Sequence, residues 1–582
     1  MIGILLLAVS LWIETVPAAP ISRDDPEKAD LTTTSVSTAA GSAVVVTAHP
    51  KASAAALSML QAGGHAVDAL VAAQAVLAVV EPQSSGLGGG GFLLHWDARQ
   101  RNLEVLDGRE TAPARSRPDD LLTPNGQPLP WRDATRRPTA IGIPGTVALL
   151  WKAHQQHGHL PWASTLAPAI RLARDGFQPS QRFQRSIQLA QRLGTAHSPA
   201  FEALYLPSGK PASTERRFRN PALARTLQQL ARDGGPAFYR GGLAKTILRQ
   251  INALAKDEPD FRGWSATDLS SYAVISRVPL CAMWLTDQLC TVPPPSSGGL
   301  AVLQSMALLT QPGHTLDPTL PSTWRRLANA IAWADADRLY WIRDPIDGPP
   351  PIRALLDPAY IRQRSLAMGA SDGSSPGPGL PPGIKRYPFA VPGSGQEQGT
   401  THLSIIDSQG NVISYTASVE TVFGSRHVVA GMVMNNQLTD FSFRPSIAGQ
   451  PVANQRRPGR RPVSSMAPFI VFRNGDPVLA LGSPGGRRIP HYLSRVLVAS
   501  LIWGEPPERA VALPHLSKSS TRLALERDAP LPWPIAPSGL ASTHQPVLFQ
   551  DFGSGIALLQ RINGRWHGAA DPRREGTAVA LP

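Results

Sequence analysis

Cysteine is scarce in this chain of 582 residues, which contains only Cys281 and Cys290. The nine positions that separate them could form a hairpin and bring the two thiols close together. In an oxidising compartment such a pair can form a disulfide, and otherwise it stays as two buried thiols. The spacing leaves both alternatives open.

Metal-binding motifs are also lacking. We find no His-Glu-x-x-His motif, no paired-cysteine spacing and no histidine spacing that we associate with zinc. The run "GLGGGG" formally matches a dinucleotide fingerprint through Gly86, Gly88 and Gly91. That fingerprint needs a strand before it and a helix after it, whereas here an apolar helix precedes it and strand patterns follow. We therefore expect a structural turn here, no metal and no cofactor.

Apolar runs of membrane length are missing as well. The run from Ile2 to Ile13 is too short to span a bilayer and is followed by small residues near Ala18 and Ala19. This pattern is typical of a signal peptide, although it has no basic start. We expect a signal peptide over 1–19, a polar leader over 20–42 and a soluble periplasmic or secreted protein without a stable membrane anchor.

Acidic residues are fewer than basic ones, 42 against 56, so the net charge is +14. Such a balance can indicate nucleic acid, anionic lipid or carboxylate partners. The arginines are spread along the chain, and no nucleic-acid-binding motif accompanies them. We therefore expect a solvated basic surface and no nucleic-acid partner.

The apolar patterning predicts both helices and hairpins. An Ala-rich helix should end at Gly63 and Gly64, and the next segment, 65–82, is apolar on all sides and should be a buried helix. Segments 92–96 and 103–106 predict a hairpin, and 140–260 is mostly helical. We see no internal repeat.

The composition changes sharply at residue 400. Segment 371–399 is rich in Pro, Gly and Ser and predicts an extended connector. It is followed by two alternating apolar and polar segments, one with a turn at 407–411 and one with Asn474-Gly475, which predict hairpins. A connector therefore leads directly into a β segment that begins with threonines.

This junction suits a particular chemistry. A threonine hydroxyl is a poor nucleophile at neutral pH, and the residue's own α-amine can activate it once the chain is cut before it. Gly399 before Thr400 allows the strained backbone that an N-to-O acyl shift passes through. The alternative is that Thr400 and Thr401 only begin a strand, where threonine is common. His402 should share the strand face of Thr400, as a hydrogen-bonded core histidine rather than a general base.

A series of further motifs resembles the γ-glutamyltranspeptidases. These are "TTHLS" at 400–404, "VFGS" at 422–425, "NNQLTDF" at 435–441, "RPVSSM" at 461–466 and "GSPGG" at 482–486. Upstream, "EPQSSGLGGGGF", "LDGRETAP" and "PPPSSGG" match as well, and "AADPRREG" matches near the end. The resemblance covers roughly 43–515 and the last dozen or so residues, in the family's order.

The resemblance implies roles for individual residues. Thr400 would be the nucleophile after cleavage between Gly399 and Thr400, and Ser418 would hydrogen-bond its hydroxyl. The backbone N–H groups of Gly485 and Gly486 would form the oxyanion hole. Arg109, Ser464 and Ser465 would bind the α-carboxylate of the substrate's amino-acid head. Asp440 and Gln437 would bind its α-ammonium, and Glu420 would do the same by its position.

Three features depart from the family pattern. Glu420 stands where some members have asparagine and others glutamate, so it adds negative charge near Asp440. The loop over 441–460 is short and lacks the aromatic residue that covers the site in some relatives, so we expect a more open cleft. Segment 515–550 follows no family motif that we can place.

The resemblance implies an α/β (α+β) protein with the αββα four-layer sandwich of N-terminal-nucleophile hydrolases. A large subunit, 43–399, and a small subunit, 400–582, would form a heterodimer within one folded unit. The implied function is a γ-glutamyltransferase and glutathione hydrolase that passes the γ-glutamyl group of glutathione and other γ-glutamyl amides to water, amino acids or peptides. The alternatives are a related acylase (a glutaryl-cephalosporin acylase or a poly-γ-glutamate hydrolase) and an unprocessed, non-enzymatic binding protein.

Overall fold

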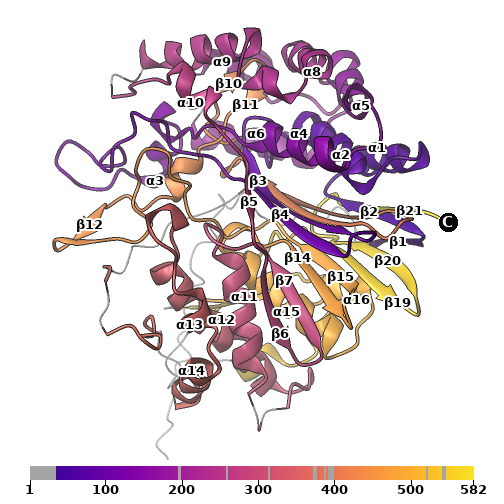
Figure 1. Ribbon diagram of the computed structural model, residues 1–582, viewed down its shortest axis with the longest axis vertical. Coiled ribbons are helices and arrows are strands. Elements are labelled where there is room, and N and C mark those ends of the chain that lie inside the picture. The colour runs from indigo at the N-terminus through magenta and orange to yellow at the C-terminus, as the bar shows by residue number, and fades with distance from the viewer. Residues whose placement is uncertain are drawn as a thin grey trace, which may run out of the picture.

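Two stacked antiparallel sheets form the centre of the protein in this computed structural model (Figure 1). It describes residues 35–582 except 195–197, 257, 259, 312, 314, 371–375, 386–387, 391–398, 520–521 and 541–545. The predicted signal peptide, most of the polar leader and about half of the predicted connector lie outside these residues.

The first sheet contains the predicted junction. Its strands in spatial order are β21 (Thr577–Leu581), β2 (Ala43–Thr47), β8 (Thr400–Ile406), β9 (Val412–Ser418), β3 (Gly90–Asp97), β4 (Asn102–Gly108) and β5 (Ile275–Arg277). The hairpin of β8 and β9 therefore lies between strands from the N-terminal part of the chain.

The second sheet is built mainly from C-terminal strands. Their spatial order is β1 (Ser37–Gly41), β20 (Arg565–Ala570), β19 (Ala557–Ile562), β15 (Asp476–Gly482), β14 (Phe469–Arg473), β7 (Asp287–Thr291) and β6 (Leu280–Trp284). Residues 37–41, which we expected within the polar leader, thus form an edge strand that pairs with β20.

Side chains alternate between the two faces of each strand, and in the first sheet both faces are apolar. Val44 and Val46 on β2 pack between the sheets, whereas Val45 packs toward the helices. Leu94 on β3 lies between the sheets and its neighbour Leu93 on the helix side. Because both faces are covered, these strands are apolar almost throughout.

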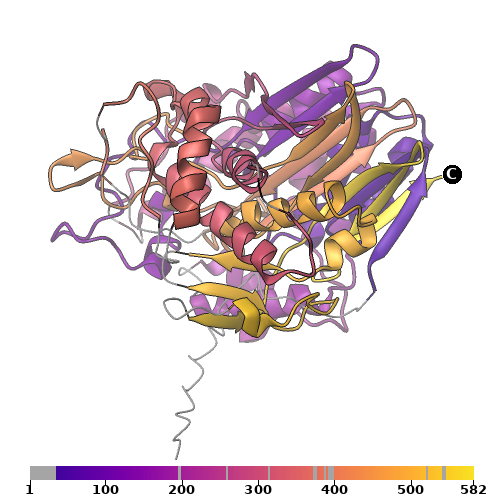
Figure 2. The same cartoon turned by 90° about the horizontal axis from the view of Figure 1, so that it is seen from below.

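Helices cover the outer face of each sheet (Figures 1 and 2). Over the first sheet lie α1 (Pro50–Gln61), α2 (Ala66–Val80), α4 (Thr146–His157), α5 (Trp162–Asp175), α6 (Gln181–Leu193), α8 (Pro221–Asp233) and α9 (Gly242–Ala253). Over the second lie α11 (Gly298–Leu309), α12 (Pro321–Trp341), α14 (Pro358–Ala370), α15 (Ile489–Leu501) and α16 (Pro507–Ala512). This arrangement confirms the predicted αββα sandwich.

Local predictions are largely confirmed. Every residue of α2 is buried, as its all-round apolar character predicts, because α5 covers the side that faces away from the sheet. The hairpins at β3–β4, β8–β9 and β14–β15 form as predicted. Cys281 on β6 is directly opposite Cys290 on β7, and the two form a disulfide.

Segment 515–550 builds a small sheet of its own. Strands β16 (Leu516–Lys518), β17 (Leu523–Glu526) and β18 (Val547–Gln550) pair in that order. In addition, Arg573 from "AADPRREG" forms an ion pair with Glu526 on β17. A buried charge pair therefore joins this small sheet to the C-terminal motif.

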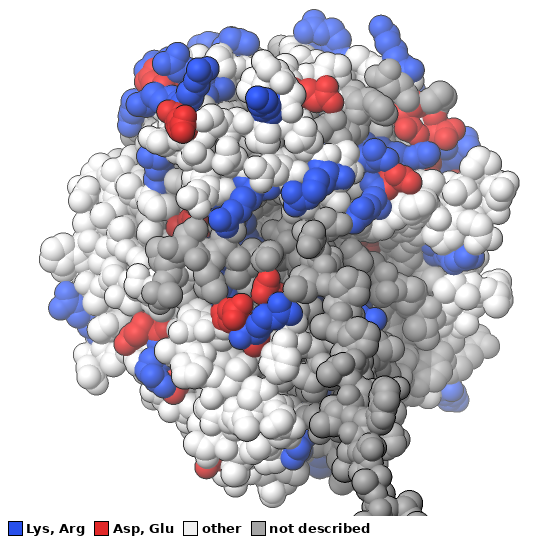
Figure 3. Space-filling view, turned by 180° about the vertical axis from the view of Figure 1, so that it is seen from behind, with Lys and Arg blue, Asp and Glu red and all other residues white. Residues whose placement is uncertain are grey.

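Charged side chains are mixed on the face shown in Figure 3, where Lys and Arg are scattered with Asp and Glu among them. Such a surface fits the predicted solvated basic surface. Among the helices in the described part of the chain, none is both long and apolar enough to cross a membrane.

Candidate active site

Thr400 is the first residue of β8 and lies directly opposite Ser418, the last residue of β9. The chain runs unbroken from Gly399 to Thr400, so this is the uncleaved polypeptide. The Thr400 hydroxyl donates to Ser418 Oγ over 3.4 Å. Both side chains are buried, at 4% and 3% exposure. The strand pairing therefore places the two predicted hydroxyls together.

Ser418 also contacts the predicted scissile bond. Its hydroxyl donates to the carbonyl oxygen of Gly399 over 2.6 Å and accepts from the backbone N–H of Glu420 over 2.8 Å. Gly399 has φ +97°, in the left-handed region that favours glycine. The carbonyl before Thr400 is therefore held by a hydroxyl donor.

Thr400 lines a small cavity. Seven residues predicted from the motifs line it, together with Met466; the seven are Arg109, Thr400, Ser418, Glu420, Gln437, Asp440 and Ser464. They come from positions far apart in the chain and from loops at the ends of β4 and β9. The fold thus brings the predicted nucleophile and most of the predicted substrate-binding residues to one place.

Opposite charges meet in this cavity. The Arg109 guanidinium contacts the Asp440 carboxylate and donates to the carbonyl oxygens of Pro462 (3.2 Å) and Val463 (3.0 Å). Gln437 Nε2 donates to Asp440 Oδ2 over 2.7 Å. The Arg109 side chain is fully buried and that of Asp440 is 3% exposed. A cation and an anion are thus fixed side by side with little access to water.

A second carboxyl group lies behind Arg109. Glu110 is fully buried, and its Oε2 is 3.7 Å from Arg109 Nη1. Burial raises the pKa of Glu110 to about 8, against the attraction of Arg109. Near neutral pH this group is therefore mostly protonated and uncharged. The positive charge of Arg109 is then available to Asp440 and to a ligand.

Glu420 occupies an unusual backbone position, with φ +84°. Its Oε2 accepts from Asn436 Nδ2 over 2.8 Å, and Asn436 Oδ1 accepts from the N–H of Thr421. The preceding Asn435 bonds to Gly88 and Gly142. The two asparagines of "NNQLTDF" therefore support the site, a role for which the motif was the only signal in the sequence.

Apart from Gly399 at the predicted cleavage position, three predicted residues are not part of the cavity lining in the uncleaved chain. Ser465 accepts from Arg338 Nη1 over 2.8 Å instead. Gly485 (φ +124°) and Gly486 (φ +55°) form the turn after β15. The turn follows Gly482, the last residue of β15. A β-carbon added at Gly482 would lie 2.2 Å from the His402 ring, so this strand end packs closely against His402.

Two further residues fix the nucleophile's strand. Arg574 Nη1, from "AADPRREG", donates to the carbonyl oxygen of Thr400 over 3.1 Å, which the sequence did not reveal. His402 is fully buried between Thr416 Oγ1 (2.8 Å) and Ser404 Oγ (3.1 Å), and burial lowers its pKa to about 3. It is the predicted hydrogen-bonded core histidine.

Comparison with known proteins agrees with this geometry. The family model for gamma-glutamyltranspeptidase matches residues 52–581. The chain is similar to the glutathione hydrolase proenzyme of Bacillus subtilis (strain 168), with 32% identity over 555 residues that cover 92% of this chain and 91% of that one. It is also similar to the acylase ACY 1 proenzyme of Pseudomonas sp. (strain V22), with 30% identity over 96% of both chains.

Among solved structures, the cephalosporin acylase from Bacillus halodurans superposes with a TM-score of 0.81 and 25% identity. The superposition covers 94% of this chain and 97% of the other. The family match covers every strand of the two sheets except β1 and β2, and it includes the cavity and the motif around Arg574. This chain is an enzyme of the gamma-glutamyltranspeptidase family.

Proposed function

We propose that this enzyme cuts its own chain between Gly399 and Thr400 and then transfers γ-glutamyl groups through Thr400. The donors would be glutathione and other γ-glutamyl amides, and the acceptors water, amino acids or peptides. The observation that carries this proposal is that the Thr400 hydroxyl shares one buried cavity with the Arg109–Asp440 pair.

Self-cleavage would begin with attack of Thr400 Oγ1 on the carbonyl carbon of Gly399. The amide becomes an ester, and the hydroxyl proton passes to the new α-amine of Thr400. Water then hydrolyses the ester and leaves a Gly399 carboxylate and a free Thr400 hydroxyl. The Ser418 hydroxyl, 2.6 Å from the Gly399 oxygen, can stabilise the negative charge that develops there.

In turnover, the new amine would accept the Thr400 proton while the hydroxyl oxygen attacks the γ-carbonyl of the substrate. The leaving amine takes up a proton, and a γ-glutamyl-threonine ester remains. Water resolves the ester by hydrolysis, and an acceptor amine resolves it by transfer. The backbone N–H groups of Gly485 and Gly486, in the turn after β15, would stabilise the negative charge on the carbonyl oxygen during this attack.

The charge pair supports an amino-acid head as the bound group. Arg109 would bind the α-carboxylate through its guanidinium, with Ser464 and Ser465 donating to the same group. Asp440, Gln437 and Glu420 would receive the α-ammonium. A zwitterionic head would give Arg109 a carboxylate and Asp440 an ammonium. These new ion pairs would compensate for breaking the Arg109–Asp440 pair in a buried site.

The related acylases define the principal alternative, because the chain resembles a cephalosporin acylase over most of its length. A glutaryl group carries the carboxylate that Arg109 would bind, but it has no ammonium for Asp440 and Glu420. A glutaryl carboxylate would compete with Asp440 for Arg109 without bringing an ammonium group in exchange, which costs free energy. We therefore favour the γ-glutamyl substrate.

Kinetics with matched anilides test this choice. We expect kcat/KM for a γ-glutamyl anilide to exceed that for the glutaryl anilide by at least about 100-fold, on the order of one lost buried ion pair. Asp440→Asn should reduce this ratio, chiefly through the γ-glutamyl substrate. Faster turnover of the glutaryl anilide by the unaltered enzyme would support the acylase instead.

A denaturing gel tests the cleavage step. The unaltered enzyme should give two fragments, the smaller starting at Thr400 by N-terminal sequencing, and Thr400→Ala should give one. We propose that the fragments remain together as a heterodimer of 43–399 and 400–582, located in the periplasm or outside the cell. A single intact chain that is active would contradict the cleavage mechanism, and a single intact chain that is inactive would support the non-enzymatic alternative.

A further inference from the structure

A group of histidines gathers at the end of the first sheet remote from Thr400. His95 on β3 is directly opposite Glu104 on β4, and His157 is the last residue of α4, which packs on β4. One ligand atom of each residue lies within 4.8 Å of the others. Two imidazoles and a carboxylate therefore converge from three elements.

The His95 imidazole is buried and unsatisfied. Its ring is 1% exposed, and neither ring nitrogen has a hydrogen-bond partner within the described residues. A neutral imidazole carries a lone pair on one ring nitrogen that can bind a metal ion. Leaving a buried polar group without a partner costs free energy, and a bound ion would remove that cost.

Glu104 lies between the two imidazoles. Its Oε2 is 2.8 Å from His157 Nε2 and 3.7 Å from His95 Nδ1, and the two rings have centroids 4.2 Å apart. The carboxylate therefore offers an oxygen ligand between two imidazole nitrogens.

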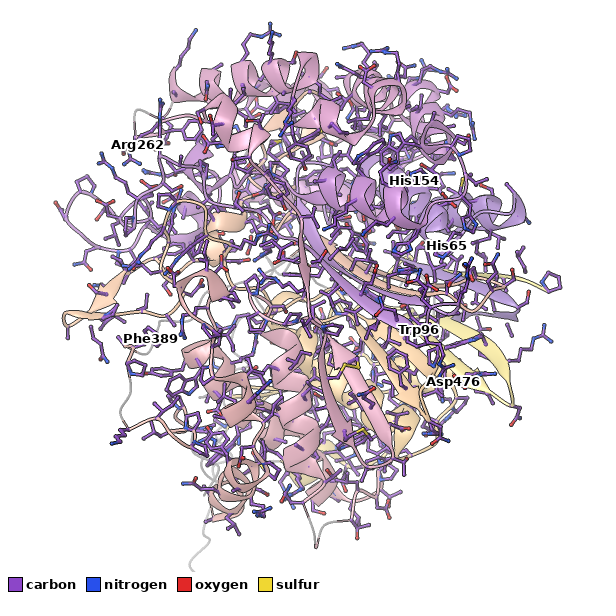
Figure 4. All side chains as sticks on the ribbon, viewed as in Figure 1. His65, Trp96, His154, Arg262, Phe389 and Asp476 are labelled. Carbon is purple, nitrogen blue, oxygen red and sulfur yellow. A yellow bond between two sulfur atoms is a disulfide. The ribbon has the colours of Figure 1, made fainter. Side chains whose placement is uncertain are left out.

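Two more histidines surround this group. His65 and His159 have ring centroids 5.3 Å apart, and His65 is also 5.3 Å from His95. His65 is already engaged, because its Nδ1 accepts from the N–H of Val67 and its Nε2 is 4.0 Å from Asp407. Figure 4 shows His65 between His154 and Trp96, the neighbour of His95.

We propose that His95, Glu104 and His157 bind one divalent transition-metal ion, with zinc as the best fit and water as a fourth ligand. Imidazole and carboxylate are zinc's usual nitrogen and oxygen ligands, whereas calcium and magnesium prefer oxygen alone. Tetrahedral zinc with bonds of about 2.0–2.1 Å needs ligand atoms roughly 3.3 Å apart. The two distances from Glu104 Oε2 bracket that value.

The site is accessible and separate from the active site. The side chains of Glu104 and His157 are 30% and 12% exposed, so an ion can enter from solvent. On β3, Gly90 pairs with Ser418, and His95 is five residues further along, about 16 Å away at the usual rise of a strand. The ion would join the β3–β4 hairpin to α4 and so stabilise the fold without taking part in catalysis.

Titration of untagged, chelator-treated protein with zinc tests the site. We expect about one equivalent per chain, measured against a chromophoric chelator and by elemental analysis, and a tetrahedral absorption spectrum with Co²⁺. Zinc should raise Tm by on the order of 2–5 °C, because it binds only the folded chain. Excess Ca²⁺ or Mg²⁺ should not compete.

Three variants distinguish a site from surface binding. Glu104→Gln and His157→Gln remove proposed ligands at partly exposed positions, and each should weaken zinc binding by at least about tenfold. His159→Gln removes an exposed neighbour and is the matched control, which should bind like the unaltered protein. Substoichiometric binding by the unaltered protein, unchanged binding in Glu104→Gln, or loss only in His159→Gln would overturn the proposal.

Discussion

At the residue scale, Ser418 connects the nucleophile with the bond that it would cut. It contacts both Thr400 Oγ1 and the Gly399 carbonyl oxygen, and the short contact is the one to the carbonyl. Its hydroxyl is thus placed to donate where charge would develop during the proposed self-cleavage. After that cleavage the Gly399 carboxylate would no longer be bonded to Thr400, and the same hydroxyl would be left to Thr400.

Removal of this hydroxyl should slow maturation. We expect Ser418→Ala to cleave about 10²–10³-fold more slowly, the usual effect of losing one oxyanion donor. Ser418→Thr retains a hydroxyl and is the matched control, which should cleave at nearly the original rate. A time course of fragment appearance on denaturing gels measures both. Equal rates for Ser418→Ala and the unaltered chain would show that the contact is only structural.

Glu110 makes the stability of the protein depend on pH. Its pKa is raised from 4.5 to about 8, so between these values the folded protein holds a proton that the unfolded chain has lost. The contribution of this proton to the free energy of unfolding is therefore complete below about pH 4.5 and is lost as the pH rises through 8. Glu110→Gln cannot ionise and should lack this loss.

Calorimetry between pH 5 and pH 8 measures that difference. The Tm of Glu110→Gln minus that of the unaltered protein should become more positive as the pH rises. Parallel Tm profiles would mean that Glu110 is ionised in the folded protein, and that outcome would contradict the assignment of a neutral acid.

At the element scale, the junction of the connector and β8 depends on Gly399. A β-carbon there would lie 2.7 Å from the Glu420 carbonyl oxygen and 2.9 Å from that of Thr421, at φ +97°. Any other residue must shift the backbone of the scissile bond. The left-handed conformation alone costs about 1–2 kcal/mol for a residue with a side chain.

Gly399→Ala should therefore impair cleavage more than stability. Gly410, in the turn between β8 and β9, is the matched control because it also has a positive φ, +88°, but its β-carbon would approach only Ala98, at 3.4 Å. We expect Gly410→Ala to lower Tm slightly and to cleave normally. Normal cleavage of Gly399→Ala would show that this backbone position is not required.

Elements with a strong local pattern were predictable. Alternation and Asn474-Gly475 predicted the β14–β15 hairpin, and the continuous apolar run predicted the buried helix α2. Strand β1 was not predicted, because the segment before residue 42 is polar and is stabilised as an edge strand only by pairing with β20.

At the scale of the whole molecule, cleavage would divide the chain without dividing the fold. Strands β8 and β9 of the proposed small chain lie between β2 and β3 of the large one, and β21 pairs with β2 on its other side. Both sheets thus contain strands from both proposed chains. Separating the fragments would expose the core between the sheets.

The two fragments should therefore behave as one particle. Gel filtration of the cleaved enzyme should give one peak that contains both fragments, at the elution volume of uncleaved Thr400→Ala. Denaturant should be required to separate them, and it should abolish activity at the same concentration. Separation in buffer alone, with activity kept by either fragment, would contradict this arrangement.

The amino-acid sequence was enough to predict the layered fold class, the strand–turn pattern around Thr400 and the identity of most residues in the cavity. These predictions were possible because the hydrophobic period and the turn residues are properties of short segments, and because the family motifs contain the site residues in a fixed order. Which distant groups meet could be seen only once the chain was folded. The pairing of Arg109 with Asp440, the contact of Arg574 with Thr400 and the meeting of His95, Glu104 and His157 all join residues far apart in the chain or on different elements. Such contacts depend on strand order and on how helices pack over sheets, which no short stretch of sequence encodes.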